Sequence, residues 1–232
     1  MNSPVVSVVI PAFNEEKSIA KCLQSVCGQD FNKPFEVILV NNNSSDKTEE
    51  IASKFPVKIL SEPKQGYVYA LIKGFSRAKG EYVALTDADT VVPRDWLSKI
   101  YFEYKNDSKT VAVGGGAVMT PKNFYLWVID LVLNAASSIF KIFSGFNFSV
   151  KKSTYDQLGG FREDLNFNVD TDLCFRLKRC GRVVFLRDNK VITSSRHYRG
   201  IKGIFYSAKG ILNVISLKIL NRTLFFNFGD AR

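Results

Sequence analysis

The chain has 232 residues, of which 46% are hydrophobic and 23% are charged. This is the composition of a folded globular protein, and the length suits one large domain rather than two of ordinary size. A formal net charge of +10 favours an anionic partner, namely a nucleic acid, a phosphorylated ligand or a membrane surface.

Hydrophobic runs of strand length alternate with helical patterns through the first half of the chain. The runs predict strands at 5–10, 35–40, 57–60 and 82–86, and helices at 15–27, 46–54, 65–78 and from Pro93 onward. Short apolar strands separated by helices are typical of a parallel sheet that helices cover on both faces. The predicted fold class is therefore α/β, a Rossmann-like single domain with a mostly parallel central sheet.

Three polar clusters follow predicted strands, in the segments PAFNEE, NNNSSD and TDADT. Ligands of open α/β sheets bind beyond the carboxyl ends of the strands, so we expect these clusters to form one crevice. The third cluster holds Asp87 and Asp89, two carboxylates that repel one another unless a positive charge lies between them. The alternative interpretation is an acidic turn, because Asp and Thr are common in turns.

Two later segments interrupt the regular alternation. The glycines at 114–116 are predicted to form a bend between two strands, with a phosphate cradle as the alternative. The apolar segment 124–143 approaches the ~20 residues that a membrane span needs, yet Asp130, Lys141 and a polar centre interrupt it. We therefore expect a helix that packs on the domain or lies at an interface.

The last part of the chain is basic and apolar at the same time. From Arg196 onward there are seven lysines and arginines against the single acid Asp230, with bulky apolar residues between them. This pattern is typical of a helix that lies in an anionic membrane interface. The alternative is a helix packed across the domain with its lysines in solvent. We divide the chain accordingly into a domain at 1–195 and a helical, basic, amphipathic extension at 196–232.

Five stretches of the chain resemble the motifs of the inverting glycosyltransferases of family 2, in order and in spacing. They are SVVIPAFNEE, VNNNSSDKT, AKGEYVALTDADT, GGFRED and DTDLCFRL. The resemblance implies the GT-A fold, with a nucleotide-sugar-binding half at 1–120 and an acceptor-side half at 121–195. It also implies metal-dependent, inverting transfer of a sugar from a nucleotide diphosphate sugar to a hydroxyl or phosphate acceptor. The Q-x-x-R-W motif of processive synthases is absent, which favours one sugar per encounter.

The resemblance assigns the donor site to the first half of the chain. Asp89 would bind Mn²⁺ or Mg²⁺ and Asp87 would face the ribose, since hard cations bridge carboxylates and phosphates. Asn42 would offer its carbonyl to a uracil N–H, which favours a UDP-sugar and leaves a GDP-sugar open. The implied nucleotide-sugar-binding residues are Pro11, Ala12, Phe13, Glu15, Asn42, Asp87, Ala88 and Asp89, with Lys73 in place of a missing phosphate-side arginine. Arg196 and Arg199 are further candidates for diphosphate contacts.

On the acceptor side, the resemblance implies a carboxylate that takes the proton from the attacking hydroxyl. Asp170 keeps this position, although Val169 replaces the glutamate that precedes it in the family, and Asp172 is the alternative base. Capping of the helix that follows is the other interpretation of both acids. The acceptor would lie above the loop at 159–161, where the glycines allow close approach of the backbone; the loop residues are Gly159, Gly160 and Phe161.

The chain has one histidine, His197, and four cysteines without a CxxC pair, which excludes zinc-finger spacing. His197 is a candidate second metal ligand by resemblance, with a basic surface residue as the alternative. The cysteines are expected to be reduced thiols, and the first residues lack the features of a signal peptide. We therefore expect a cytoplasmic protein that is peripheral at the cytoplasmic face of the membrane.

Three other classes of function compete with a sugar transferase. A sugar nucleotidyltransferase would begin with a glycine-rich activating loop, and PAFNEE is not one. A nucleic-acid-binding protein would explain the charge, but no recognisable binding motif is present. A catalytically inactive, membrane-associated relative that still binds nucleotide sugars stays open. The expected partners are a nucleotide-sugar donor, a glycan or lipid-linked acceptor and an anionic membrane surface, without nucleic acid.

Overall fold

The computed structural model describes residues 3–121, 124–165, 168–198 and 200–224. The strands are β1 (Val6–Ala12), β2 (Phe35–Asn41), β3 (Lys58–Ser61), β4 (Tyr82–Leu85), β5 (Thr110–Thr120), β6 (Phe148–Lys151) and β7 (Arg182–Ser194). The α-helices are α1 (Ile19–Cys27), α2 (Thr48–Ala52), α3 (Tyr67–Arg77), α4 (Trp96–Asn106), α5 (Phe124–Phe140), α6 (Lys152–Gln157), α7 (Val169–Leu177) and α8 (Gly200–Leu220). Two short 3₁₀ helices are η1 (Gly145–Asn147) and η2 (Arg196–Tyr198).

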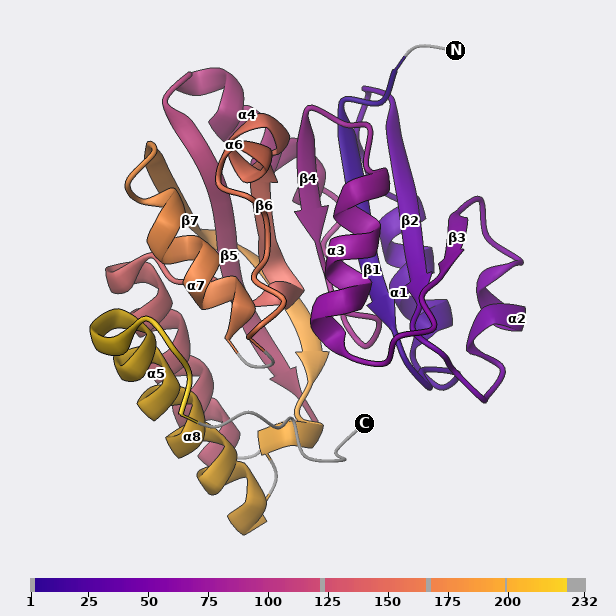
Figure 1. Cartoon of the computed structure of the whole chain (residues 1–232). Coiled ribbons are helices and arrows are strands. Elements are labelled where there is room, and N and C mark those ends of the chain that lie inside the picture. The colour runs from indigo at the N-terminus through magenta and orange to yellow at the C-terminus, as the bar shows by residue number, and fades with distance from the viewer. Residues whose placement is uncertain (1–2, 122–123, 166–167, 199, 225–232) are drawn as a thin grey trace.

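The strands form one mixed sheet in the order β3-β2-β1-β4-β6-β5-β7 (Figure 1). The first four strands are parallel to one another, and β7 is parallel to β5. Only β6 runs against its neighbours, β4 and β5. The prediction of an α/β fold with a mostly parallel sheet is confirmed.

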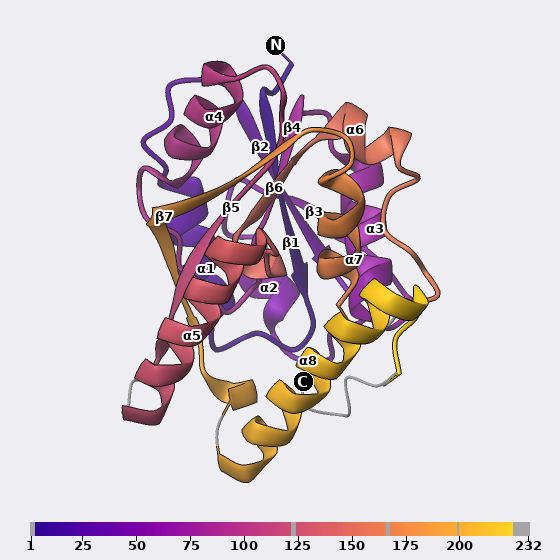
Figure 2. The ribbon, with the colours of Figure 1, turned by 90° about the vertical axis from the view of Figure 1, so that its left-hand side faces the viewer.

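Helices cover both faces of this sheet (Figure 2). Successive side chains of a strand point to opposite faces, so Val8 and Ile10 of β1 pack with α1 and α4, whereas Val9 packs with α3 and α7. The apolar side chains on each face of the sheet form a buried cluster. The cluster with α3 and α7 contains Phe75, and the cluster with α1 and α4 contains Trp96. The rigid centre of the sheet therefore fixes the loops that follow β1 and β4.

The glycines at 114–116 lie within the buried strand β5, so the prediction of a bend between two strands is wrong, as is the phosphate cradle. The reason is close packing. A Cβ atom on Gly114 would lie 2.3 Å from the ring of Phe143, and one on Gly115 would lie 2.2 Å from the carbonyl oxygen of Asn189. Larger residues at these three positions would therefore collide with the side chains and backbone that pack against β5.

Helix α5 packs on β5 through polar residues in its otherwise apolar sequence. Asp130 accepts hydrogen bonds from the N–H of Met119, at 3.2 Å for each carboxylate oxygen. Asn134 bonds both the N–H and the carbonyl of Ala117, at 2.9 and 2.8 Å. The residues that argued against a membrane span in the sequence are therefore the ones that hold this helix on the sheet.

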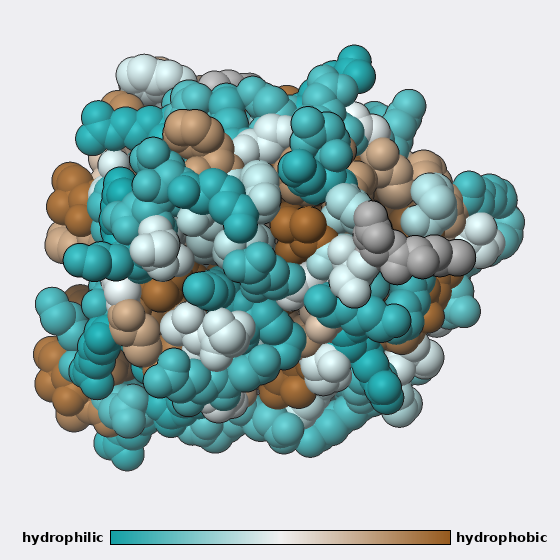
Figure 3. Space-filling view, turned by 90° about the horizontal axis from the view of Figure 1, so that it is seen from above, coloured by the Kyte–Doolittle hydropathy of each residue, from teal (hydrophilic) through white to brown (hydrophobic). Residues whose placement is uncertain are grey.

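Exposed apolar side chains gather on α5 and α8, which both lie at one end of the molecule (Figures 1 and 2). The opposite end, seen from above in Figure 3, is mostly hydrophilic. Within the described part of the chain, no helix combines the length and the apolarity that crossing a bilayer requires. The four cysteines are free thiols.

Candidate functional site

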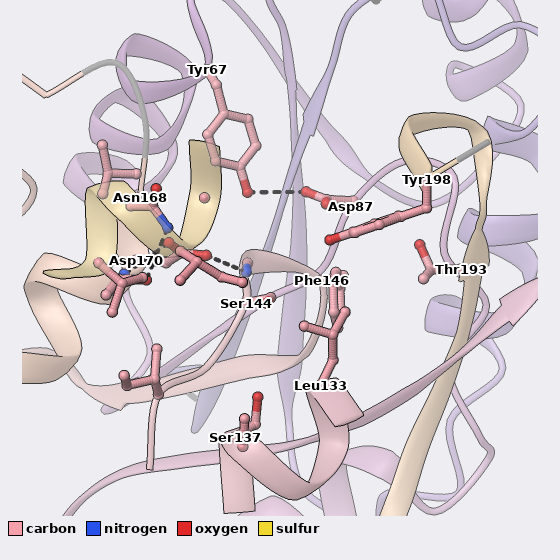
Figure 4. A pocket seen from close by; sticks show the side chains of 18 of the residues that line it. Tyr67, Asp87, Leu133, Ser137, Ser144, Phe146, Asn168, Asp170, Thr193 and Tyr198 are labelled. Atoms are coloured by element: carbon pink, nitrogen blue, oxygen red, sulfur yellow. Dashed lines mark hydrogen bonds between the residues drawn. The ribbon is translucent and has the colours of Figure 1, made fainter. Parts of the chain in front are cut away.

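A pocket of about 730 Å³ opens beyond the carboxyl ends of β1 and β4 and extends between α5 and α8. Four carboxylates line it, those of Glu15, Asp87, Asp89 and Asp170. Its far wall comes from both helices and is mostly apolar, with Leu133, Ala136 and Phe140 on α5 and Ile211, Val214 and Ile215 on α8. Two of the three predicted polar clusters, PAFNEE and TDADT, therefore reach one pocket. Asp170 lies across it from Asp87 and Tyr198 (Figure 4).

Asp87 and Asp89 lie in a tight turn directly after β4, closed by a 3.1 Å hydrogen bond from the N–H of Thr90 to the carbonyl of Asp87. The hydroxyl of Tyr67 donates to Oδ1 of Asp87 at 3.0 Å. Asp89 is only 10% exposed, and its Oδ2 lies 3.0 Å from a guanidinium nitrogen of Arg196. A positive charge therefore compensates the carboxylates, which is what their proximity requires.

Glu15 holds the other side of the same guanidinium. Its carboxylate is 6% exposed, pairs with both terminal nitrogens of Arg196 and accepts a 2.6 Å hydrogen bond from the hydroxyl of Ser18. Its backbone N–H donates to the hydroxyl of Thr48 at 2.7 Å. Asn14 has a positive φ of 53°. The N–H groups of Ser18 and Ile19 donate to the carbonyl of Glu15, so Glu15 lies in the turn before α1, which begins at Ile19, later than predicted.

The structure brings Pro11, Glu15, Asp87, Ala88 and Asp89 to the pocket, but not the other residues predicted to bind the nucleotide sugar. Those outside the pocket lining are Ala12, Phe13, Asn42 and Lys73. Ala12 is buried at the end of β1, Phe13 is half-buried beyond it, and Lys73 lies in the middle of α3.

Asn42 is committed to the backbone of the loop before α3. Its amide nitrogen donates to the carbonyls of Glu62 and Lys64, at 2.9 and 2.8 Å, and its carbonyl accepts from the N–H of Gly66 at 2.8 Å. The NNNSSD cluster thus anchors loops beside the pocket. Contact of Asn42 with a base stays a prediction.

Asp170 lies in the first turn of α7 and faces the pocket. Its two oxygens accept hydrogen bonds from the backbone N–H groups of Gly145 and Thr171, each at 2.8 Å. Burial raises the pKa of the Asp170 carboxyl above its usual range, while these two backbone hydrogen bonds act in the opposite direction. A carboxylate with a raised pKa beside a pocket is suited to accept a proton.

Asp172, the alternative base, does not line the pocket. It is buried, and it pairs with Arg176 at 2.6 Å and with Arg162 at 3.5 Å. These contacts join α7 to the loop before it. These ion pairs are sufficient reason for an acidic residue at position 172, without a catalytic role.

The loop at 159–161 also lies outside the pocket lining. Gly159 and Gly160 adopt positive φ values of 75° and 74°, which let the chain turn sharply after α6. A Cβ atom on Gly160 would meet the hydroxyl of Tyr155 at 2.8 Å, and Phe161 is buried against the rings of Phe75 and Tyr155. The close approach that the glycines allow is therefore made to Tyr155, and contact of this loop with an acceptor stays a prediction.

The carboxylates fit a divalent cation by their chemistry. Asp89 and Glu15 present hard oxygens that already hold the cationic Arg196 between them. Among the described residues there is no cluster of three histidine, cysteine or acidic ligands, so phosphate oxygens and water would have to complete the coordination. The side chain of His197 lies outside the described residues, and its role as a ligand stays a prediction.

Several pocket residues had no signal in the sequence. Tyr67 and Tyr198 come from α3 and η2, and burial raises the pKa of Tyr198 to about 12, so its hydroxyl stays protonated. Asn168, which precedes α7 with a positive φ of 57°, has a buried carbonyl oxygen without a partner among the described residues. Only the packing of distant segments places these groups in one pocket.

The chain matches the family model described as "Glycosyl transferase family 2" over residues 7–179. It is 30% identical over 200 residues to the probable glycosyltransferase YdaM of Bacillus subtilis, covering 77% of this chain and 47% of that protein. It is also 30% identical over 207 residues to the uncharacterized glycosyltransferase RT0329 of Rickettsia typhi, covering 84% of this chain and 64% of that protein. The chain thus spans about half to two thirds of the length of these two relatives.

A similar solved structure is that of the mannosyltransferase PcManGT from Pyrobaculum calidifontis, in complex with GDP-Man and Mn²⁺. The TM-score is 0.75 at 25% sequence identity, over 95% of this chain and 65% of that one.

Proposed function

This chain belongs to glycosyl transferase family 2, and on that premise we propose that it transfers one sugar from a nucleotide diphosphate sugar to an acceptor hydroxyl, with inversion. The observation that carries the proposal is the placement of two kinds of carboxylate in one pocket. Glu15, Asp87 and Asp89 lie together at the strand ends, and Asp170 faces them with a raised pKa.

The donor diphosphate would lie against the carboxylates at the ends of β1 and β4. Asp89 would hold Mn²⁺ or Mg²⁺, which when bound offsets the negative charge of the departing diphosphate. Asp87, fixed by the hydroxyl of Tyr67, would face the ribose. Pro11 and Ala88 border this part of the pocket and would limit its width.

The base of the donor is either uracil or guanine. The side-chain carbonyl oxygen of Asn42 already accepts a hydrogen bond from the N–H of Gly66. Only its second lone pair would be available to a uracil N–H. The complex of PcManGT holds GDP-Man, which supports a GDP-sugar at 25% identity. Both nucleotides therefore belong in the test.

Asp170 would take the proton from the attacking hydroxyl. Direct displacement inverts the anomeric centre because the nucleophile enters opposite the departing diphosphate. The ionised carboxylate is the form that accepts the proton, and the N–H groups of Gly145 and Thr171 keep it oriented toward the pocket. Positioned general-base catalysis of this kind contributes about 10²- to 10⁴-fold.

The acceptor is proposed to be a glycan or a lipid-linked glycan at an anionic membrane surface, at its cytoplasmic face. Supporting this, the acceptor end of the pocket is walled by apolar residues of α5 and α8. The outer sides of the same helices expose Phe124 (79%) and Ile219 (73%). Large exposed apolar patches mark interaction surfaces.

Release of nucleoside diphosphate from a panel of UDP- and GDP-sugars, with Mn²⁺ and with soluble and lipid-linked acceptors, tests the proposal. We expect acceptor-dependent release from one nucleotide class, and release about 10²- to 10⁴-fold slower from Asp170→Asn. Binding of a nucleotide without release from any sugar would favour an inactive, nucleotide-sugar-binding relative. Formation of a nucleotide sugar from a sugar phosphate and a nucleoside triphosphate would instead identify a nucleotidyltransferase.

A further inference from the structure

We propose that Arg196 and a divalent cation bind the same carboxylates in alternation, and that Arg196, once released, binds the donor's diphosphate. This inference rests on the proposed function. It assigns to the donor site a residue, Arg196, that would exchange its carboxylate partners for the diphosphate when the metal and the donor bind. Arg196 comes from η2, far from the strand-end carboxylates in sequence, 181 positions after Glu15.

The contacts of Arg196 place its charge where a metal ligand set is expected. One terminal nitrogen lies 3.0 Å from Oδ2 of Asp89 and also pairs with Glu15, while the second terminal nitrogen donates to Glu15 at 3.2 Å. Both carboxylates are almost fully buried, so their charges are poorly screened by solvent. A single guanidinium thus holds together two acids that would otherwise repel.

The charge balance favours exchange. Glu15, Asp87 and Asp89 carry three negative charges around the one positive charge of Arg196. A divalent cation brings twice the charge of Arg196 to the same oxygens and prefers them as hard ligands. Because the two cations share Asp89, the binding of one weakens the hold of the other.

Arg196 also has a donor that its present partners do not use. Its Nε is buried and has no hydrogen-bond partner among the described residues. An unsatisfied buried N–H is costly, and a guanidinium matches phosphate oxygens with paired donors. Arg196 therefore combines a position beside the metal-binding acid with an unused donor suited to a diphosphate.

The first arm of the test measures Mn²⁺ binding without nucleotide, by the paramagnetic resonance signal of free Mn²⁺. Wild type is compared with Arg196→Gln and with Arg94→Gln, a control that removes an arginine from an exposed ion pair with Asp30. We expect Arg196→Gln to bind Mn²⁺ about tenfold more tightly than wild type, since a competing charge is removed. The control should match wild type.

The second arm measures binding of UDP and GDP by calorimetry at a Mn²⁺ concentration that saturates both wild type and Arg196→Gln. For the nucleotide that wild type binds, we expect Arg196→Gln to lose about tenfold in affinity, because it removes a charged phosphate contact. The same substitution should thus strengthen the binding of the cation and weaken that of the anion. A residue that only stabilises the fold would weaken both.

Unchanged or weaker Mn²⁺ binding by Arg196→Gln would overturn the exchange, and unchanged nucleotide binding would overturn the diphosphate contact. If Arg196→Gln does not fold, Arg196→Lys replaces it. The shorter ammonium cannot pair with both acids as the guanidinium does, so Mn²⁺ should still bind more tightly than in wild type, and equal affinity would overturn the exchange. If wild type binds neither nucleotide, the proposed function fails instead, and the Mn²⁺ arm alone decides the exchange.

Discussion

Asp170 meets the two requirements of a proton acceptor at this pocket, access to the cavity and a pKa above that of an ordinary carboxyl. We predict that Asp170→Asn lowers kcat by about 10²- to 10⁴-fold, because an amide cannot take the hydroxyl proton. Affinity for the nucleotide should stay within about twofold, since Asp170 lies across the pocket from Asp87. Steady-state kinetics and calorimetry together measure both effects.

Asp172→Asn is the matched control for this substitution, because it changes an acid two residues away that does not line the pocket. It breaks the pair with Arg176 and should lower stability while leaving kcat of the folded enzyme near wild type. Normal turnover by Asp170→Asn with loss of turnover in Asp172→Asn would show that Asp172 is the base.

The pH dependence of activity follows from the raised pKa of Asp170. The carboxylate must be ionised to act, so kcat/KM should fall as the pH is lowered through the pKa of Asp170. Burial disfavours the charged form, which places the midpoint of this acid limb above the ordinary value of 3.8. A midpoint at or below 3.8 in the pH profile of kcat/KM would contradict the assignment.

The carboxylates of the site could be predicted from the sequence, whereas their partners could not. Asp87, Asp89 and Glu15 directly follow apolar runs, and the end of a parallel strand is a position that local patterns reveal. Arg196 was a candidate for a diphosphate contact, but its pairs with Glu15 and Asp89 form only through contacts between distant segments. Tyr67 and Asn168 reach the pocket in the same way. Asp172 and Phe161 also match motifs, and the structure shows that Asp172 forms an ion pair and Phe161 lies in the core. Their roles toward an acceptor stay predictions.

At the scale of elements, α5 depends on polar contacts to stay on the sheet. We predict that Asp130→Ala lowers the free energy of unfolding by about 1–3 kcal/mol, because the buried N–H of Met119 loses its acceptor. Asp30→Ala, which removes an exposed acid, should change it by less than about 0.5 kcal/mol. Urea unfolding measures both changes. Equal effects of the two substitutions would argue against the role of Asp130 in holding α5 on β5.

The exposed apolar residues of α5 and α8, together with the basic residues of α8, predict binding to anionic membranes. Each lysine or arginine near an anionic surface contributes about 1 kcal/mol, so anionic vesicles should retain more protein than neutral ones. Ile219→Asp on α8 and Phe124→Asp on α5 should weaken co-sedimentation. Phe102→Asp is the control, because Phe102 is similarly exposed (63%) but lies on α4.

Equal partitioning onto neutral and anionic vesicles would reject the electrostatic part of this account. Equal loss in the Phe102→Asp control would reject the α5 and α8 surface. A soluble acceptor would then be the better assignment for the apolar end of the pocket.

The sequence predicted the existence of the early elements better than their limits. The strands at 5–10, 35–40 and 57–60 correspond closely to β1, β2 and β3, because continuous apolar runs mark buried parallel strands. The first four helices begin two to four residues later than predicted. Before α2, for example, Asp46 accepts hydrogen bonds from the N–H groups of Glu16 and of Thr48, the first residue of the helix. The prediction for the glycines of β5 is wrong because glycine is required there by contacts with the ring of Phe143 and the backbone of Asn189, which the sequence does not reveal.

At the scale of the whole molecule, one sheet carries both ends of the pocket. The predicted halves at 1–120 and 121–195 meet in it, since β6 pairs with β4 and β5, and β7 pairs with β5. The boundary proposed at residue 195 falls directly before Arg196, which pairs with Glu15 in the first turn. The described part of the extension therefore supplies Arg196 to the pocket as well as the wall formed by α8.

A nucleoside diphosphate and a divalent cation are proposed to bind together at Asp89, and a thermal-shift panel can detect this joint binding. A ligand that binds only the folded state raises the melting temperature, so UDP and GDP are each tested with Mn²⁺ on wild type and on Asp89→Ala. We predict that one nucleotide raises the melting temperature of wild type in an Mn²⁺-dependent way, and that Asp89→Ala folds but loses this shift. The same shift in Asp89→Ala, or no shift with either nucleotide in wild type, would contradict the account.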